Sequence, residues 1–409
     1  MSMPHSPRYT APWPCYTDEE IHAVAAVLRS NKVNYWTGEE CRQFEREFAV
    51  WAETDHAVAL ANGTVALDLA LHGLRVGSVN GGSASDEVVV TPRSFMASAS
   101  CVANAGAVPV FADVDAESGN LSAETIGAVL TERTRAIILV HLNGWPADMD
   151  PIMALAEARG IKVIEDCAQA HGARYKGRSV GSIGHVGAWS FCQDKIMTTG
   201  GEGGMVTTND QALWSRMWSF KDHGKSWEAI YERAHPPGFR WVHDSIGTNW
   251  RMIEIQAVIG RIQLGRMADW TAARTANAAR LSAALTPLAG VEGPVRLPDF
   301  APHAAAGSVH AHYKFHLFLR LNRLRPGWSR ESVSEAITSR GVPCFAGPCS
   351  EIYLEKAFDG TGWRPPAPLP VTREQGQSSL MLLIHPTLDA EQVKEAGAVV
   401  AEVITAATQ

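Results

Sequence analysis

The 409-residue sequence has no run of about 18 apolar residues, the length at which a helix becomes a candidate membrane span. Its N-terminus is polar and proline-rich, without the apolar segment of a signal peptide. An excess of positive charge is also absent, because the formal net charge is -7, which argues against a nucleic-acid partner. These absences predict a cytoplasmic protein that has neither a membrane nor a nucleic acid as its partner.

Cysteine is sparse and shows no metal-binding pattern. The seven cysteines are an odd number without CxxC spacing, so we interpret them as reduced thiols, with Cys192 as a packing residue. Two phosphate-binding motifs are missing as well: there is no GxGxxG between a first strand and helix, and no GxxxxGK(S/T). The glycine cluster at residues 200–204 is therefore interpreted as a tight passage between strands, and not as a nucleotide loop.

Short apolar runs alternate with helix-like segments through the first half of the chain. Several runs are continuously apolar, as in parallel strands that are buried on both faces. The alternation predicts an α/β fold with a doubly wound, mostly parallel sheet. The predicted strands cover residues 56–60, 87–91, 108–114, 135–142, 162–167, 186–191 and 205–208, and the predicted helices between them include 64–74, 98–106, 122–130 and 151–159.

The pattern changes after a long amphipathic helix that we expect from about residue 252 towards residue 285. A strand-like run, a helix-like run and a closing helix from Ala390 follow it. We therefore predict a large domain with an N-terminal arm over residues 1–262 and a smaller α/β C-terminal domain over residues 263–409. The long irregular stretch at 221–243 is predicted to be a lid or binding loop.

Three features lie where a doubly wound sheet binds its ligands, at the carboxyl ends of the strands. Gly63 and Thr64 open a helix that would bind a phosphate, although an ordinary N-cap explains the pair equally well. Asp166 ends a buried strand and needs a partner, either a helix N-terminus or a protonated ring nitrogen. Lys195 is either a partly desolvated nucleophile or a solvated lysine on a surface hairpin.

These features are together the minimal set for pyridoxal 5'-phosphate (PLP), and the sequence around them resembles the DegT/DnrJ/StrS family of sugar aminotransferases. The resemblance implies the PLP-transferase fold type I. It runs in the same order over nearly the whole chain, from the Trp36-Thr37-Gly38 turn to His385-Pro386. The segments that carry it are 62–67, 163–173, 189–191 with Lys195, 201–204 and 247–251.

The resemblance also implies a role for each matching residue. Lys195 would bind the cofactor covalently, Asp166 would pair with the pyridine nitrogen, and Gln169 would lie on the hydroxyl side of the ring. Phe95 would stack on the ring. The phosphate would be held by Gly63, Thr64 and Ser190, and by Asn249 of the neighbouring subunit, so the resemblance implies a homodimer with shared active sites.

The implied reaction transfers an amino group from glutamate or glutamine to a keto-sugar, most commonly a nucleotide-linked 4-keto-6-deoxyhexose. Surface polysaccharide such as O-antigen, or a secondary metabolite, would be the end product. The alternatives are an aminotransferase or dehydratase acting on a cyclitol or aryl precursor, and a non-catalytic PLP-binding regulator. Family dehydratases carry histidine in place of the lysine, so Lys195 favours transamination. The preceding Cys192-Gln193-Asp194 differs from many relatives and makes the substrate harder to infer.

Substrate contacts are predicted from two further segments. The family places a strand of the small domain over the active site, which makes His312 and Tyr313 substrate-side residues. Lys225, in the 221–243 stretch, would meet a nucleotide diphosphate, although a solvated loop explains the cations of this stretch equally well. His310, His312 and His316 share one face of a strand, but no carboxylate or cysteine accompanies them, so we predict no metal.

Overall fold

A seven-stranded sheet forms the centre of the molecule, with the strand order β1-β9-β8-β5-β4-β2-β3. The computed structural model describes residues 11–238 and 240–408, so the first ten residues of the predicted arm lie outside the described part. Neighbouring strands are parallel, except that β9 is antiparallel to both β1 and β8. The doubly wound, mostly parallel sheet is thus confirmed. Its strands are β1 (His56–Leu60), β2 (Glu87–Val90), β3 (Val108–Phe111), β4 (Thr134–Val140), β5 (Lys162–Asp166), β8 (Val186–Ser190) and β9 (Gly204–Thr208).

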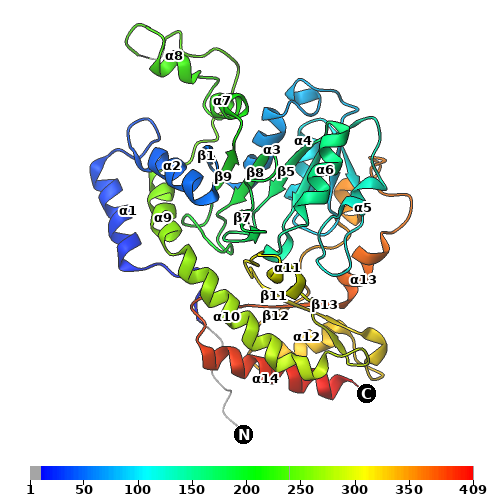
Figure 1. The fold of residues 1–409 in the computed structure, drawn as a ribbon. Helices are drawn as coiled ribbons and strands as arrows, with labels where there is room; N and C mark the ends of the chain where they lie inside the picture. Colours follow the sequence, from blue (N-terminus) through cyan, green and yellow to red (C-terminus); the bar gives the residue numbers. More distant parts are fainter. Residues whose placement is uncertain (1–10, 239, 409) are drawn as a thin grey trace.

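Helices cover both faces of this sheet (Figure 1). Alternate residues of one strand point to opposite faces: Val88 of β2 packs with α3, α4 and α7, whereas Val89 packs with α5 and α6. Helices α2 and α9 cover β1, β8 and β9 from the second side. The helices of this part of the molecule are α1 (Asp18–Ser30), α2 (Glu40–Ala52), α3 (Gly63–Gly73), α4 (Ala97–Asn104), α5 (Ala123–Gly127), α6 (Met149–Arg159), α7 (Gln211–Phe220) and α9 (Glu254–Gly265).

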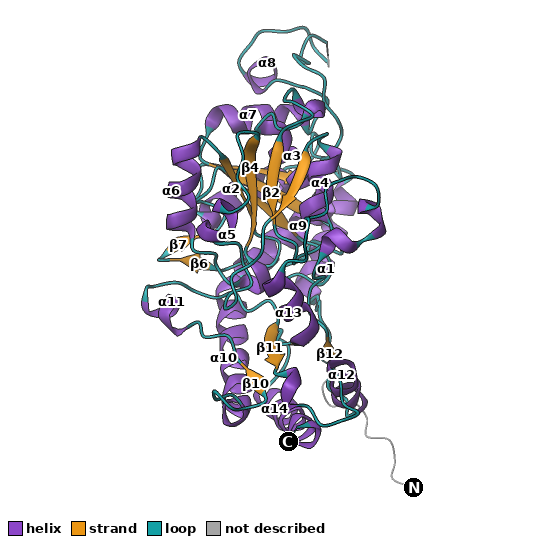
Figure 2. Ribbon diagram, turned by 90° about the vertical axis from the view of Figure 1, so that its right-hand side faces the viewer, coloured by secondary structure: helices purple, strands orange, loops and turns teal. Residues whose placement is uncertain are grey.

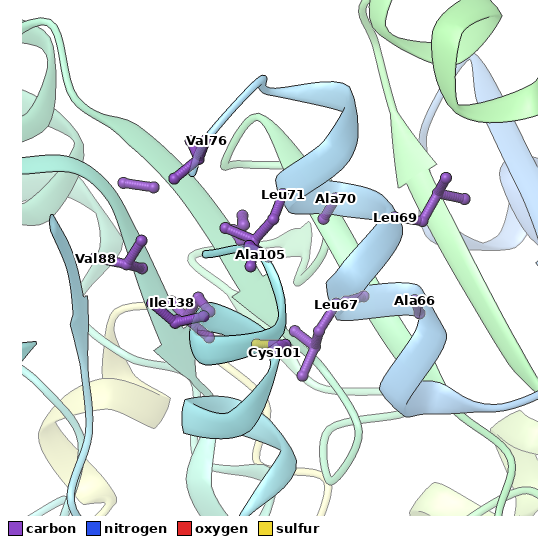
Figure 3. Close-up of a cluster of buried hydrophobic side chains, with 14 of the residues drawn as sticks. Ala66, Leu67, Leu69, Ala70, Leu71, Val76, Val88, Cys101, Ala105 and Ile138 are labelled. Carbon is purple, nitrogen blue, oxygen red and sulfur yellow. The ribbon is translucent and has the colours of Figure 1, made fainter. Parts of the chain in front are cut away.

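Helix α3 packs closely against the sheet, and it begins at the site discussed below. Figure 3 shows Leu67 and Leu71 of α3 beside Cys101 of α4 and Ala105, the residue after α4, with Ile138 of β4 on the other side of α4. All of these side chains are at most 4% exposed. Because such interiors are close-packed, the N-terminus of α3 is held at a fixed position above the sheet.

A second, four-stranded antiparallel sheet lies below the first, in the order β10-β11-β13-β12 (Figure 2). It packs against α10, α12 and α14 around a separate apolar cluster. The predicted boundary between residues 262 and 263 falls within α9 and stays a prediction. The elements of this part are α10 (Met267–Leu285), β10 (Val295–Arg296), α11 (Ala301–Ala305), β11 (Phe315–Leu319), α12 (Arg330–Ser339), β12 (Cys344–Phe345), α13 (Pro370–Ser378), β13 (Ser379–Leu382) and α14 (Ala390–Ala407).

Two predictions about elements need correction. The single helix expected over 252–285 is two helices, because α9 ends at Gly265 and α10 starts at Met267; glycine is a poor helix former. The irregular stretch at 221–243 contains a short helix, α8 (Trp227–Tyr231), which projects from the molecule in Figure 1. A small hairpin, β6 (Arg174–Tyr175) and β7 (Arg178–Ser179), was not expected. None of the described helices is long and apolar enough to span a membrane.

Gly204 sits where three backbone segments meet at the start of β9. It pairs with Leu60 of β1 on one side and with Ser190 of β8 on the other. A Cβ at Gly204 would lie 2.3 Å from the carbonyl oxygen of Asn62, which is a backbone atom and has little freedom to move. The approach of the β1–α3 connection to the sheet therefore requires glycine here.

We expect Gly204→Ala to lower the free energy of unfolding by roughly 1–3 kcal/mol, because the added methyl group overlaps a fixed carbonyl. The matched control is Gly265→Ala, at a position where an added Cβ meets nothing within 4 Å. Denaturant unfolding of both variants checks this. Equal effects of the two substitutions would contradict the close approach at Gly204.

Candidate active site

The start of α3 and the end of β8 form a cradle of small residues. Asn62 is the N-cap of α3, and its Oδ1 accepts a hydrogen bond from Val65 N at 3.0 Å. The amides of Gly63 and Thr64 belong to the first turn, where a helix has no intrahelical acceptors. A Cβ at Gly63 would lie 2.4 Å from Ser190 Cβ. The ordinary N-cap is therefore present, and it leaves the next amides available to an anion.

Asp166 ends β5 and is 5% exposed. Its Oδ2 accepts from Ser98 Oγ at 2.9 Å and its Oδ1 from Ala168 N at 3.1 Å. No described cationic side chain lies within ion-pair distance of it. Burial raises the pKa of this carboxyl, although Ser98 and Ala168 oppose the shift. Asp166 is thus a carboxylate whose charge is only partly compensated.

Lys195 lies in the connection between β8 and β9. These are central strands, so the surface-hairpin interpretation was wrong. The Lys195 side chain is 15% exposed, and its Nζ lies 3.9 Å from Asp194 Oδ1. The same Nζ lies 5.2 Å from the ring centroid of Tyr313, whose hydroxyl donates a hydrogen bond to Asp194. Trp13 Nε1 donates to the Lys195 carbonyl at 2.9 Å and fixes the backbone below the amine.

One cavity of about 520 Å³ brings most of the predicted cofactor residues together. This volume lies within the ordinary range for ligand sites. Phe95 borders it and is 69% exposed, which suits an aromatic ring that stacks on a ligand. Gln169 is held in place because its Oε1 accepts from Asn143 N at 2.7 Å. The predicted residues that line the cavity are Gly63, Thr64, Phe95, Asp166, Gln169, Ser190 and Lys195.

The structure does not bring the remaining predicted residues to this cavity. Asn249, in the loop after α8, is exposed and forms a backbone bridge with Asp222, which precedes α8. Lys225 is buried, with its Nζ 2.9 Å from Asp222 Oδ1 and 4.2 Å from the ring centroid of Trp36. His312 lines a different cavity, described below. Within this chain, Tyr313 is the predicted substrate residue that lies near Lys195, and the roles of the other three stay predictions.

The three histidines do not form a compact ligand set. The rings of His310 and His312 stack with centroids 4.0 Å apart, and His310 Nδ1 accepts from His312 N. Among the described residues, the one compact group is His141, Glu165 and Cys167. Its atoms are hydrogen-bonded to one another and to backbone groups: Glu165 accepts from His141 Nε2 at 2.9 Å and from three backbone amides. This group stabilises the fold.

Sequence reasoning missed two residues of the site. Ser98 donates to Asp166, and its Oγ lies 3.1 Å from Ser94 Oγ, one helical turn earlier. The spacing of Ser94 and Ser98 at the start of a helix was an available signal. Asp194 was noted only as a departure from the relatives, although a carboxylate next to a reactive lysine is itself a candidate for electrostatic control.

The residues present fit PLP. The cavity has the size of a ligand site, a helix N-terminus that suits a phosphate, and a lysine at one side. The decisive observation is Asp166, because a buried carboxylate without a close cation is complementary to a protonated ring nitrogen.

Comparison with known proteins agrees with this fit. Residues 14–403 match the model of the DegT/DnrJ/EryC1/StrS aminotransferase family, and the chain belongs to this family. It is therefore a PLP-dependent aminotransferase with the PLP-transferase fold type I.

Three relatives illustrate the similarity. The dTDP-3-amino-3,4,6-trideoxy-alpha-D-glucose transaminase of Streptomyces venezuelae is 34% identical over 90% of this chain and 88% of its own. The UDP-N-acetyl-3-dehydro-alpha-D-glucosamine 3-aminotransferase of Acidithiobacillus ferrooxidans is 34% identical over 94% and 93%. The crystal structure of an aminotransferase from Psychrobacter cryohalolentis is 56% identical, covers 97% of this chain and 99% of its own, and has a TM-score of 0.93.

The raised pKa of Asp166 yields a prediction for the cofactor-free protein. A carboxyl whose pKa is higher in the folded state stabilises the fold when protonated, and this contribution is lost as the pH rises through the folded pKa. Asp166→Asn should therefore raise the melting temperature of the cofactor-free protein at pH 7. The difference should vanish about one to two pH units below the unfolded-state pKa of about 3.9, where the carboxyl is protonated in both states.

With PLP bound, the order should reverse, because the carboxylate then has a cationic partner. Thermal unfolding of the wild type and the variant, with and without PLP and across this pH range, checks both statements. A cofactor-free variant that melts below the wild type at pH 7 would show that Asp166 is already satisfied in the chain alone.

Proposed function

We propose that this chain transfers an amino group from glutamate or glutamine to a nucleotide-linked keto-sugar, most commonly a 4-keto-6-deoxyhexose. The observation that carries the proposal is the single cavity shared by Lys195, Asp166 and the Gly63–Ser190 cradle. Two of the compared relatives support the substrate class, because one is named for a dTDP-sugar and the other for a UDP-sugar.

Each cavity residue has a proposed task in holding the cofactor. Lys195 binds it covalently, and Asp166 hydrogen-bonds the pyridine nitrogen and keeps it protonated. Gln169 contacts the hydroxyl side and Phe95 stacks on the ring. The phosphate is bound at the start of α3 by Gly63 and Thr64, together with Ser190 and with Asn249 of the partner subunit. PLP, when bound, supplies an electron sink for the α-carbon of an amino acid.

Lys195 is also the proposed acid and base of the reaction. Among the described residues, Lys195 is the lysine that lines the 520 Å³ cavity, and its Nζ would take the α-proton of the amino donor and later return a proton to the sugar carbon. Asp194, 3.9 Å away, stabilises the protonated amine and is itself held by the Tyr313 hydroxyl. Tyr313 is thus proposed to position Lys195 through Asp194.

The sugar is proposed to occupy a second cavity of about 390 Å³ that adjoins the first. The two cavities share Ser94, Phe95, Gln169, Asp194 and Lys195. Tyr313 borders the second cavity. The shared lysine would therefore face the cofactor on one side and the substrate carbonyl on the other.

The setting of the reaction is part of the proposal. We place the enzyme in the cytoplasm, as a homodimer, in the assembly of a surface polysaccharide such as O-antigen. The exposed Trp241 and Ile246, near Asn249 in sequence, are apolar residues that a partner subunit would cover.

The amino-donor half of the reaction gives the first test. Purified protein loaded with PLP should be yellow and should lose this absorbance band on addition of glutamate or glutamine. The band should return when the correct nucleotide-linked keto-sugar is added. Lys195→Ala, reconstituted with PLP, is the control that lacks the band of the lysine-bound cofactor. A wild-type spectrum that no amino acid changes would refute transamination and favour the regulatory alternative.

Shared active sites give the second test. Lys195→Ala should lack transaminase activity, and Asn249→Ala should have reduced activity when PLP is limiting. A mixture exchanged through mild denaturant contains heterodimers with one complete site, and random pairing should restore about a quarter of the wild-type activity. Failure of the mixture to exceed the separate variants would place Asn249 outside the partner's site.

A further inference from the structure

A third cavity, of about 440 Å³, lies between the loops of the large sheet and the segment that leads into β11. Arg93, which follows β2, borders it together with Trp145, which follows β4. Lys314 and His316 line this cavity and also the 390 Å³ cavity that contains Lys195. The third cavity therefore adjoins the substrate cavity along one short segment, and nothing in the proposed function uses it.

Arg93 is a buried cation in the lining of this cavity. It is 1% exposed, and its Nη1 donates to Ser350 Oγ at 2.6 Å. Its Nε and Nη2 are buried and have no hydrogen-bond partner among the described residues, and no described carboxylate forms an ion pair with it. Burial lowers the pKa of Arg93 to about 10, with Glu374 opposing the shift, so the side chain stays charged at neutral pH.

The two unpartnered nitrogens of Arg93 define the geometry of a ligand. Nε and Nη2 lie on the same edge of a guanidinium and donate in parallel, which matches the two oxygens of a carboxylate. A buried charge without a partner is costly, and a bound anion would compensate it. The edge of Arg93 is therefore suited to a planar carboxylate.

Two other unpartnered polar groups belong to the same cavity lining: Trp145 Nε1 and Gln375 Oε1. The Gln375 amide is fixed, because its Nε2 donates to the carbonyl of Ala116 at 2.9 Å. A Cβ at Gly119 would lie 3.2 Å from Gln375 Oε1 and 4.0 Å from Arg93 Nε, so both groups flank this glycine. The cavity thus offers donors to an anion and one acceptor to an N–H or O–H group.

The charge of the cavity favours one carboxylate over a diphosphate. Burial lowers the pKa of His312 to about 4 and that of His316 to about 3, so these rings are neutral at pH 7. Glu117, at the edge of the cavity, pairs with Arg296 at 3.4 Å. Arg93 and Lys314 are then the cations available, and a ligand with several negative charges would be poorly matched.

We propose that Arg93 binds a carboxylate of the amino-acid donor, with the donor reaching from this cavity past Lys314 and His316 to Lys195. This inference rests on the proposed transamination. It assigns the amino donor to the third cavity and leaves the more open 390 Å³ cavity to the sugar.

The test uses the PLP-loaded enzyme and two variants, Arg93→Gln and Arg93→Lys. Glutarate, which has both carboxylates of glutamate and no amino group, measures binding without reaction by titration calorimetry. Both variants should bind glutarate roughly 10- to 100-fold more weakly, because lysine keeps the charge but loses the parallel fork. The concentration of glutamate needed to bleach the yellow band should rise by a similar factor.

Three controls make the result decisive. Arg340→Gln removes a guanidinium that follows α12, pairs with Glu402 and lines none of the three cavities, and it should leave glutarate binding unchanged. The PLP spectrum and melting temperature of the Arg93 variants establish that the site is folded. The concentration dependence on the nucleotide-linked keto-sugar should not change.

The outcomes separate this inference from the proposed function. If the wild type is bleached by glutamate but glutarate binds wild type and Arg93→Gln equally, the Arg93 assignment is overturned and transamination stands. A selective loss of affinity for the keto-sugar would overturn it as well. If no amino acid bleaches the wild type, transamination fails whatever the Arg93 variants bind.

Discussion

The active site depends on a close approach of backbone segments at the start of β9. A Cβ at Gly204 would lie 2.3 Å from the Asn62 carbonyl, and one at Gly63 would lie 2.4 Å from Ser190 Cβ. These two glycines allow the N-terminus of α3 to rest on the ends of β8 and β9. The connection that carries Lys195 joins the same two strands. The helix N-terminus and the lysine are therefore placed by one set of contacts, and a side chain at either glycine would move both.

Two neighbouring carboxylates on β5, Glu165 and Asp166, have different roles, one in the fold and one in the site. Glu165 and Asp166 point to opposite faces of the sheet, because successive residues of a strand alternate. Glu165 is fully buried and accepts from His141 and three amides, and its pKa is lowered despite burial. Asp166 accepts hydrogen bonds only from Ser98 and Ala168 among the described residues, and its pKa is raised. The satisfied carboxylate holds the fold together, whereas the poorly satisfied one is left for a ligand.

Most of the fold could be predicted because a parallel sheet buried on both faces leaves continuous apolar runs in the sequence. β1 matches its predicted range, and β5 and β8 differ from theirs by one residue. The break between α9 and α10 and the two-residue strands were missed, because their signals are shorter than a helical turn. Gly63, Thr64 and Asp166 could be located for the same reason, because the apolar runs show where the strands end. Lys225 was placed by the charge of its loop and His312 by resemblance, and backbone pattern does not determine where such side chains point.

The segment from His310 to His316 borders two of the three cavities, the Arg93 cavity and the 390 Å³ cavity that contains Lys195. His312 borders the Arg93 cavity, the next residue Tyr313 borders the cavity of Lys195, and Lys314 borders both. Arg274 donates to the carbonyl of Tyr313 at 3.1 Å and holds this segment from below. The Tyr313 hydroxyl in turn holds Asp194 beside Lys195. One short segment therefore borders both the Arg93 cavity and the 390 Å³ cavity, and its Tyr313 hydroxyl holds the carboxylate that lies beside Lys195.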